Sequence, residues 1–93
     1  MLKFMISWKA APSFHKPTME SFLKFGAPVP QGSELIGRWH APGSMYGWVL
    51  MDTQDINTVS EHLAQWANLL EFTVPPVIED DAAGQALSKI YAK

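Results

Sequence analysis

The sequence predicts an α+β fold in which helices pack against an antiparallel sheet. Three patterns support this class: apolar and polar residues alternate over 2–8, apolar residues repeat at three- and four-residue spacing over 56–70, and two alternating segments flank a turn at 42–44. Alternation with period two is typical of strands, whereas the longer period is typical of helices. The chain has 93 residues, and a chain of this length builds a single core, so we expect one domain over residues 1–93.

A first strand is expected over residues 2–8, where Leu, Phe, Ile and Trp alternate with Lys, Met and Ser. A first helix is expected at about 17–25, because Pro17 suits the first turn of a helix and Gly26 suits the cap after the last turn. Residues 27–33 carry two prolines and a glycine, so they predict a loop into the next strand.

Residues 34–41 and the segment after the turn are predicted to pair as a hairpin. If Ala41 pairs with Met45, the side chains on either side of the turn become cross-strand neighbours. The resulting pairs are His40 with Tyr46, Arg38 with Trp48 and Ile36 with Leu50. The opposite face is apolar and is expected to pack as core. It carries Leu35, Gly37, Trp39, Met45, Gly47, Val49 and Met51.

A second helix is predicted to begin after Asp55, whose side chain can cap it. Its apolar stripe consists of Ile56, Val59, Leu63, Trp66 and Leu70. The residues predicted to face away are Asn57, Glu61, His62, Gln65 and Asn68. A fourth strand is expected at about 71–74, since Pro75-Pro76 cannot continue a strand ladder.

A third helix is predicted at the C-terminal end. Glu79-Asp80-Asp81 places carboxylates at its N-terminus, while Lys89 and Lys93 lie near its C-terminus, and this arrangement suits the helix dipole. Three apolar side chains are expected to dock this helix against the domain. They belong to Ala83, Leu87 and Ile90.

The predicted order is strand, helix, strand, strand, helix, strand, helix. This is the order of a ferredoxin-like βαββαβ plait with an extra C-terminal helix. Right-handed crossovers would place the first two helices on one face of the sheet. The opposite face then lacks cover, and a second copy of the chain would supply it.

Composition favours a homodimer and excludes several classes of partner. Hydrophobic residues make up 47% of the chain and charged residues 17%, which excludes disorder and leaves more apolar area than a small monomer easily hides. The net charge is −2 and the basic residues are scattered, so we expect no nucleic-acid partner. The N-terminal apolar run is too short for a signal peptide or a membrane span, so we expect no membrane partner. The chain has no cysteine, a pattern compatible with the cytoplasm, where we expect the protein.

Metal and cofactor chemistry finds little support in the sequence. No cysteine is present, which excludes thiolate chemistry. The histidines His15, His40 and His62 lie far apart and lack the spacing of metal ligands. We therefore expect no metal site, and the sequence assigns no cofactor.

The hairpin carries the candidate site. Arg38 is a candidate for holding an anionic or carbonyl group, and His40 is the candidate general acid or base because imidazole titrates near neutral pH. Asp52 and Glu71 are candidate partners for His40. The candidate ligand-binding residues are Trp48, Tyr46, Trp39, Trp66 and Ser7.

Three hypotheses describe what these residues do. In the first, a homodimer binds a small aromatic or acidic metabolite against Trp39 and Trp48, with a contact to Arg38. In the second, an enzyme uses His40 and Arg38 for catalysis. In the third, the aromatic face is a dimer interface without a ligand, and a carboxylate neutralises Arg38.

Several segments match the pattern of a known family. They are Phe4-Met5-Ile6-Ser7-Trp8, Phe22 to Gly26, Leu35-Ile36-Gly37-Arg38-Trp39-His40, and Gln65-Trp66 through Leu70-Glu71-Phe72 to Pro75-Val77. With them, nearly the whole chain resembles the small bacterial proteins of domain of unknown function 3303, within the dimeric α/β-barrel superfamily. The resemblance implies that two plaits pack sheet to sheet and enclose small-molecule pockets. It implies no activity, because the family has none assigned.

The wider superfamily includes cofactor-free monooxygenases, haem-degrading enzymes, isomerases, decarboxylases and proteins known only as binders. For this chain, the enzyme hypothesis is therefore a cofactor-independent monooxygenase- or isomerase-like activity that uses His40 and Arg38. The haem-degrading members carry an Asn on the first strand with a Trp and a His nearby. This chain departs from that pattern, because its first strand offers Ser7, with His62 and Trp66 as a partial match.

Overall fold

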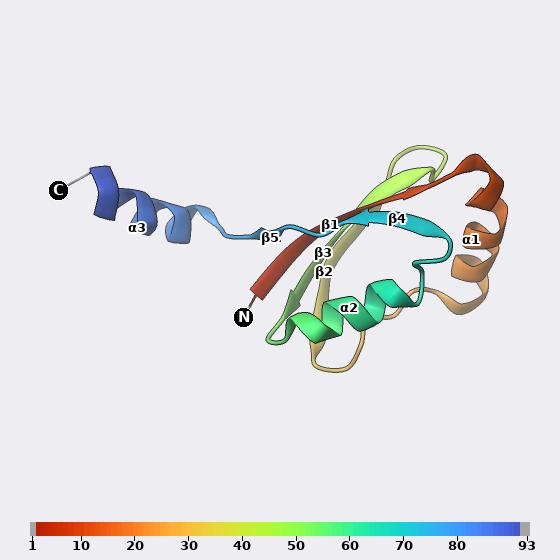
Figure 1. The fold of residues 1–93 in the computed structure, drawn as a ribbon, viewed down its shortest axis with the longest axis horizontal. Helices are drawn as coiled ribbons and strands as arrows, with labels where there is room; N and C mark the ends of the chain where they lie inside the picture. Colours follow the sequence, from red (N-terminus) through yellow and green to blue (C-terminus); the bar gives the residue numbers. More distant parts are fainter. Residues whose placement is uncertain (1, 92–93) are drawn as a thin grey trace.

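A computed structural model describes residues 2–91 of the chain (Figure 1). Its strands are β1 (Leu2–Ala10), β2 (Ser33–His40), β3 (Tyr46–Thr53), β4 (Leu70–Thr73) and β5 (Pro76–Val77). Its helices are α1 (Pro12–Phe25), α2 (Ile56–Ala64) and α3 (Asp80–Tyr91). The order of elements confirms the predicted α+β class, with β5 as a short addition after the fourth strand.

The strands form one antiparallel sheet in the order β2-β3-β1-β4. β1 lies inside the sheet, where it pairs with β3 along its length, with β4 near its C-terminal end and with β5 near its N-terminal end. Val74 and Pro75 separate β4 from β5, and the Pro75 carbonyl oxygen accepts a hydrogen bond from the Met5 N–H at 3.0 Å. Proline lacks the N–H that a continuous ladder needs, so this edge of the sheet is divided into two short strands.

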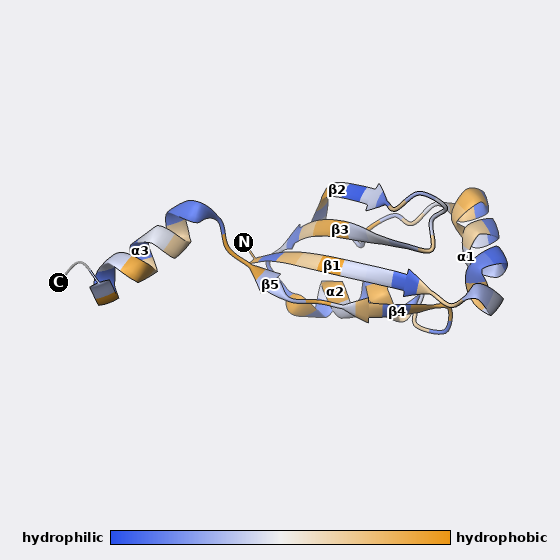
Figure 2. Ribbon diagram, turned by 90° about the horizontal axis from the view of Figure 1, so that it is seen from above, coloured by the Kyte–Doolittle hydropathy of each residue, from blue (hydrophilic) through white to orange (hydrophobic). Residues whose placement is uncertain are grey.

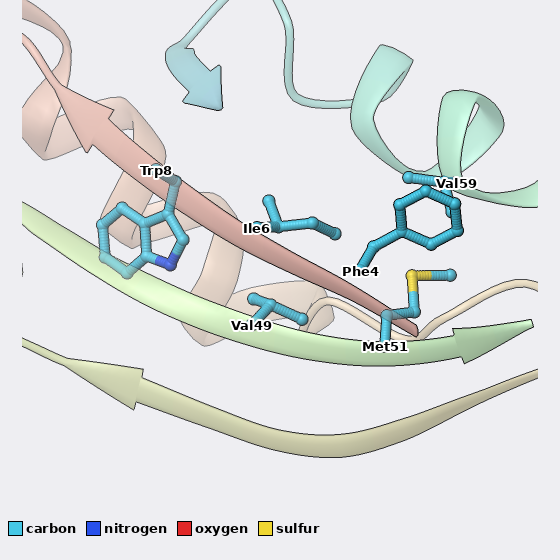
Figure 3. Close-up of a cluster of buried hydrophobic side chains, with 6 residues drawn as sticks. All are labelled: Phe4, Ile6, Trp8, Val49, Met51 and Val59. Atoms are coloured by element: carbon cyan, nitrogen blue, oxygen red, sulfur yellow. The ribbon is translucent and has the colours of Figure 1, made fainter. Parts of the chain in front are cut away.

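The core lies between α2 and the sheet face that this helix covers. Alternate residues of β1 are buried, as the period-two pattern predicts. The buried cluster consists of Phe4, Ile6, Trp8, Val49, Met51 and Val59 (Figure 3). Burying one large apolar side chain contributes about 1.5–3 kcal/mol, so this cluster holds β1, β3 and α2 together.

Helix α1 begins at Pro12, earlier than the predicted range of 17–25. Pro12 occupies the first turn, where a missing N–H costs nothing, and the helix continues through Pro17. Gly26 ends the helix as predicted, with φ at 67° and its N–H donating to the Phe22 carbonyl at 2.7 Å. α1 stands across one end of the sheet, so only α2 lies along the face where both helices are predicted (Figures 1 and 2).

Asp55 caps α2 as predicted, because its Oδ1 accepts a hydrogen bond from the Asn57 N–H at 2.9 Å. The helix ends at Ala64, before the predicted apolar stripe is complete. The Leu70 N–H then donates to the Trp66 carbonyl at 2.9 Å. This turn carries the chain from the helix into β4.

The hairpin of β2 and β3 has the predicted register at one end only. Leu35 pairs with Met51, as predicted. Between Leu35 and Gly37 the register shifts by one residue, so Ile36 is the extra residue of a β-bulge. Beyond the bulge the pairs are Gly37 with Leu50, Arg38 with Val49, Trp39 with Trp48 and His40 with Gly47. The predicted pairs that are wrong are Ile36 with Leu50, Arg38 with Trp48 and His40 with Tyr46.

The turn of the hairpin accounts for this difference. The Ala41 N–H donates to the Tyr46 carbonyl at 2.9 Å, whereas the sequence predicts that Ala41 pairs with Met45. The Met45 carbonyl instead accepts a hydrogen bond from Ala10 of β1 at 2.7 Å. The turn is therefore one residue longer than predicted, and the bulge restores the register farther along.

A shift of one residue exchanges the two faces of a strand, because side chains alternate. Arg38 and His40 consequently lie on the side of the sheet that α2 covers, beside Val49 and Gly47. Trp39 lies on the opposite side, beside Trp48. The prediction that Trp39 packs in the core is therefore wrong.

The sheet face away from α2 is called the open face here, and no helix of residues 2–91 covers it (Figure 2). Its residues include Lys3, Met5, Ser7, Lys9, Glu34, Gly37, Trp39, Tyr46, Trp48, Leu50, Asp52, Glu71 and Thr73. The Trp39 ring lies over Gly37, in space that a Cβ would otherwise fill. Tyr46 and Trp48 meet edge to face, with ring centroids 5.7 Å apart. Aromatic rings thus dominate one half of the open face.

The C-terminal helix forms as predicted, but the predicted docking is wrong. α3 projects away from the sheet (Figures 1 and 2), and none of its described residues is buried. Leu87 is 56% exposed and Ile90 is 63% exposed. The short β5 pairs beside Lys3, at the N-terminal end of β1, so the chain leaves the sheet there and α3 lies beyond it. Lys93, predicted to end this helix, lies outside the described residues.

An ion pair joins the start of the chain to the segment before α3. Lys3 donates a hydrogen bond to the Glu79 carboxylate. This bond raises the pKa of Lys3 and lowers the pKa of Glu79. Both groups are close to solvent, where such pairs stabilise a fold only slightly.

Gly47→Ala is expected to destabilise the fold. A Cβ at this position would overlap both the Trp39 carbonyl oxygen and the Trp8 ring, and overpacking of this kind costs about 1–3 kcal/mol. Urea unfolding measures the change in the free energy of unfolding. The matched control is Gly84→Ala on α3, where a Cβ meets nothing within 4 Å. Equal stability of the two variants would contradict the prediction.

Candidate functional site

A cavity lies on the helix side of the sheet. Its volume is about 50 Å³, which is enough for several water molecules or for part of a small ligand. β1 to β4, α1, α2 and the segments that follow the two helices all contribute to its wall. Most of the lining is apolar. The ionisable side chains that line it are Arg38, His40 and His62.

Arg38 reaches the cavity from β2 and is partly buried. Its Nη2 donates to the Ala27 carbonyl at 2.6 Å, and its guanidinium carbon lies 6.0 Å from the centre of the Phe22 ring. Within residues 2–91, no carboxylate forms a salt bridge with it. The carboxylate that the third hypothesis expects beside Arg38 is therefore not found in the described chain. Burial lowers the pKa of Arg38, but a guanidinium remains charged in proteins.

His62 reaches the cavity from α2 and is only 4% exposed. Its Nδ1 is buried and has no hydrogen-bond partner among the described residues. Burial lowers the pKa of His62, and the positive charge of Arg38 lowers this pKa further. The folded protein therefore favours the neutral imidazole.

His40 lines the same cavity but is more exposed than His62. Its ring meets that of Trp8 edge to face, with centroids 5.2 Å apart. Its Nδ1 lies within hydrogen-bond distance of the Ser44 Oγ, at 3.1 Å. Of the partners predicted for it, Glu71 lies on the open face opposite Lys9. The turn at Ser44 therefore orients His40, and the predicted carboxylate at Glu71 does not.

The structure divides the predicted site residues between two sides of the sheet. Those that line the cavity are Arg38, His40 and Trp66. Those that lie on the open face are Ser7, Trp39, Tyr46 and Trp48. The predicted face that joins Arg38 and His40 to Tyr46 and Trp48 does not form, because the sheet backbone separates the two pairs.

A broad groove follows the open face. Its side chains include those of Ser7, Lys9, Tyr46, Trp48, Glu71 and Thr73. The Ser7 and Thr73 hydroxyls are hydrogen-bonded to each other across β1 and β4. Aromatic rings beside polar and charged groups are typical of protein interfaces, where an apolar centre has a polar rim.

The sequence prediction places His62 on the wrong face of its helix. Val59, His62, Leu63 and Trp66 follow one another at three- and four-residue spacing, which puts them on one helix face. The spacing alone therefore indicates the buried position of His62, whereas its polarity suggests a solvent-facing one. Phe22 also lines the cavity, and only the tertiary packing of α1 reveals this.

Two further properties concern residues 2–91. No helix in this range has both the length and the apolar character that crossing a membrane requires. The same range holds no cluster of at least three His, Cys, Asp or Glu side chains suited to binding a metal ion.

A protein-family model described as Domain of unknown function (DUF3303) matches residues 2–91. The match includes every element of the structure, α3 among them. Neither the curated proteins nor the solved structures contain a match to the chain. The description of the family assigns no activity, so the function is inferred from the site.

The stability of the protein is expected to fall as the pH decreases below about 6.5, because the unfolded chain takes up a proton at His62 that the folded chain resists. Urea unfolding at about pH 7.5 and about pH 5.5 measures this difference on either side of the ordinary histidine pKa. His62→Gln is expected to reduce it. The control is His15→Gln, since His15 does not line the cavity. An unchanged pH dependence in His62→Gln would show that another group causes the loss.

Proposed function

We propose that this chain, which belongs to the DUF3303 family, forms a homodimer that binds a small molecule in the cavity between its sheet and its helices. One observation carries the binding proposal. Within the described residues, an apolar cavity contains a buried histidine without a hydrogen-bond partner and a partly buried arginine without a carboxylate. A buried imidazole nitrogen without a partner and a partly buried charge without a counter-charge both cost free energy, and perturbed ionisable groups in a cleft are typical of functional sites.

The apolar lining of the cavity is suited to the apolar or aromatic part of a ligand. Trp8, Phe22 and Trp66 line it and supply flat apolar surface. Ligand pockets commonly combine such a lining with a few polar groups that fix the orientation of the ligand. Arg38, His40 and His62 provide those groups.

The open face supports the homodimer proposal. Trp39 is 51% exposed, Tyr46 is 50% exposed and Trp48 is 40% exposed, so three large rings lie beside one another without cover in the described chain. Contiguous patches of this kind mark interaction sites. A second copy fits because a two-fold axis would bring the same patch of both chains together, and aromatic residues are enriched at interface centres.

Catalysis is a second candidate function, favoured by one observation. His40 and Arg38 line the same cavity, and the Ser44 hydroxyl orients the imidazole. His40 would transfer a proton while Arg38 stabilises developing negative charge. This is the cofactor-independent monooxygenase- or isomerase-like alternative, and a ligand found for the cavity is the first substrate to assay for it.

A thermal-shift screen against small metabolites, haem and flavins is expected to find ligands that raise the melting temperature. A ligand at about 100 times its Kd adds about 2.7 kcal/mol to the stability. Ala27→Leu is expected to abolish the shift, because Ala27 lines the cavity and the larger side chain would occupy it. The control is Ala82→Leu on the exposed surface of α3. A ligand whose shift persists in Ala27→Leu binds elsewhere, and a screen without any hit would contradict the binding proposal.

Trp48→Glu is expected to dissociate the dimer, because it places a charge among the rings of the open face. Central interface residues contribute about 2 kcal/mol or more, which corresponds to a dissociation constant raised roughly thirtyfold or more. Sedimentation velocity over a range of concentrations measures this. The control is Leu23→Glu on α1, a side chain that is 82% exposed and outside the open face. A monomeric parent protein, or a Trp48→Glu dimer as stable as the control, would refute the dimer.

A further inference from the structure

We infer that the ligand of the cavity is a small monocarboxylate with an apolar body, whose acid group binds Arg38 and a protonated His62. This inference rests on the binding function proposed above and specifies its ligand. It also assigns to His62 a role in binding that neither the sequence pattern nor the family match indicates.

The charge of the cavity wall is the first argument. The ionisable groups that line it are one arginine and two histidines, and no aspartate or glutamate within residues 2–91 lines it. Among the described residues that line the cavity with His62, those from α1, β1, β3 and β4 are uncharged, and the charged or titratable ones, Arg38 and His40, come from β2. A positive cavity with an apolar wall is complementary to an anion that carries an apolar body.

The hydrogen-bonding capacity of Arg38 is the second argument. A guanidinium has five N–H donors, and in the described chain the Arg38 side chain donates to the Ala27 carbonyl through Nη2. Because this bond anchors one side of the group to the loop after α1, the remaining donors are held in place instead of moving freely. A carboxylate is the ligand that such a planar donor set binds in two parallel hydrogen bonds.

The situation of His62 is the third argument. It is almost fully buried, and its Nδ1 has no partner in the described chain. Arg38 is close enough for its charge to disfavour the imidazolium. A carboxylate bound to Arg38 would offset that charge, so His62 could take up a proton and donate to the ligand. Binding would then be coupled to the uptake of one proton.

Isothermal titration calorimetry on the full chain tests the inference with phenylacetate, 3-phenylpropionate and hexanoate, each compared with its primary amide. The amide keeps the shape but lacks the charge, and charge-assisted hydrogen bonds are roughly twice as strong as neutral ones, so we expect the acid to bind about tenfold more tightly. Arg38→Gln is expected to remove this preference. Arg38→Lys keeps the charge without the planar fork and is expected to retain part of it.

Protonation of His62 also predicts that the affinity of the acids depends on pH. Their affinity is expected to rise by at least about threefold from about pH 8 to about pH 6, since a carboxyl group stays ionised there while the complex gains a proton. His62→Gln is expected to remove this rise. The control is His15→Gln, because His15 does not line the cavity. A rise that disappears only in a His40→Gln variant would overturn the assignment to His62.

The outcomes separate this inference from the function on which it rests. Equal binding of acids and amides would overturn the inference while leaving the cavity as a binding site. The inference would also be overturned, with the binding site retained, by a second result. In that result the acids fail to bind, while neutral compounds from the screen raise the melting temperature of the parent protein but not that of Ala27→Leu. If no compound of any class binds, the proposed function itself fails. Should Arg38→Gln prove unfolded by circular dichroism, the comparison of acid with amide on the parent protein still decides the question.

Discussion

One extra residue in β2 determines which side chains meet in the cavity. Ile36 has no partner in β3, so the strand beyond it is displaced by one position. Because strand side chains alternate between faces, this displacement directs Arg38 and His40 to the helix side and Trp39 to the other. Without the bulge, the basic side chains would join the aromatic ones on the open face, and the cavity would lose two of its three ionisable groups.

The sheet consequently has two faces of different chemistry. One bounds a small, apolar and basic cavity, and the other presents exposed rings beside polar groups. β3 shows the alternation most directly: Gly47 makes room for the Trp8 ring on the helix side, while Tyr46 and Trp48 on either side of it lie on the open face. The cavity and the open face are therefore separate surfaces of the described chain.

Much of the fold follows from local patterns in the sequence. The alternation of β1, the Asp55 cap of α2 and the glycine that ends α1 each depend on a few neighbouring residues, and all three are predicted correctly. The register of the hairpin is different in kind. The Ala10 N–H of β1, which is far from the turn in the sequence, donates a hydrogen bond to the Met45 carbonyl. No local pattern around Ile36 indicates a bulge. This single error exchanged the predicted faces of Arg38 and Trp39, and it placed Arg38 and His40 on the same face as Tyr46 and Trp48.

The projection of α3 has a consequence for how the chain unfolds. The domain ends with β5, and α3 contributes no buried side chain to the core. A lone helix of this length is only marginally stable in water, and the interior glycine Gly84 weakens it further. Asp80 and Asp81 at its N-terminus partly offset this. The chain therefore consists of two thermodynamic units: a cooperatively folded body, and a terminal segment with its own helix–coil equilibrium, which can melt and re-form while the body remains intact.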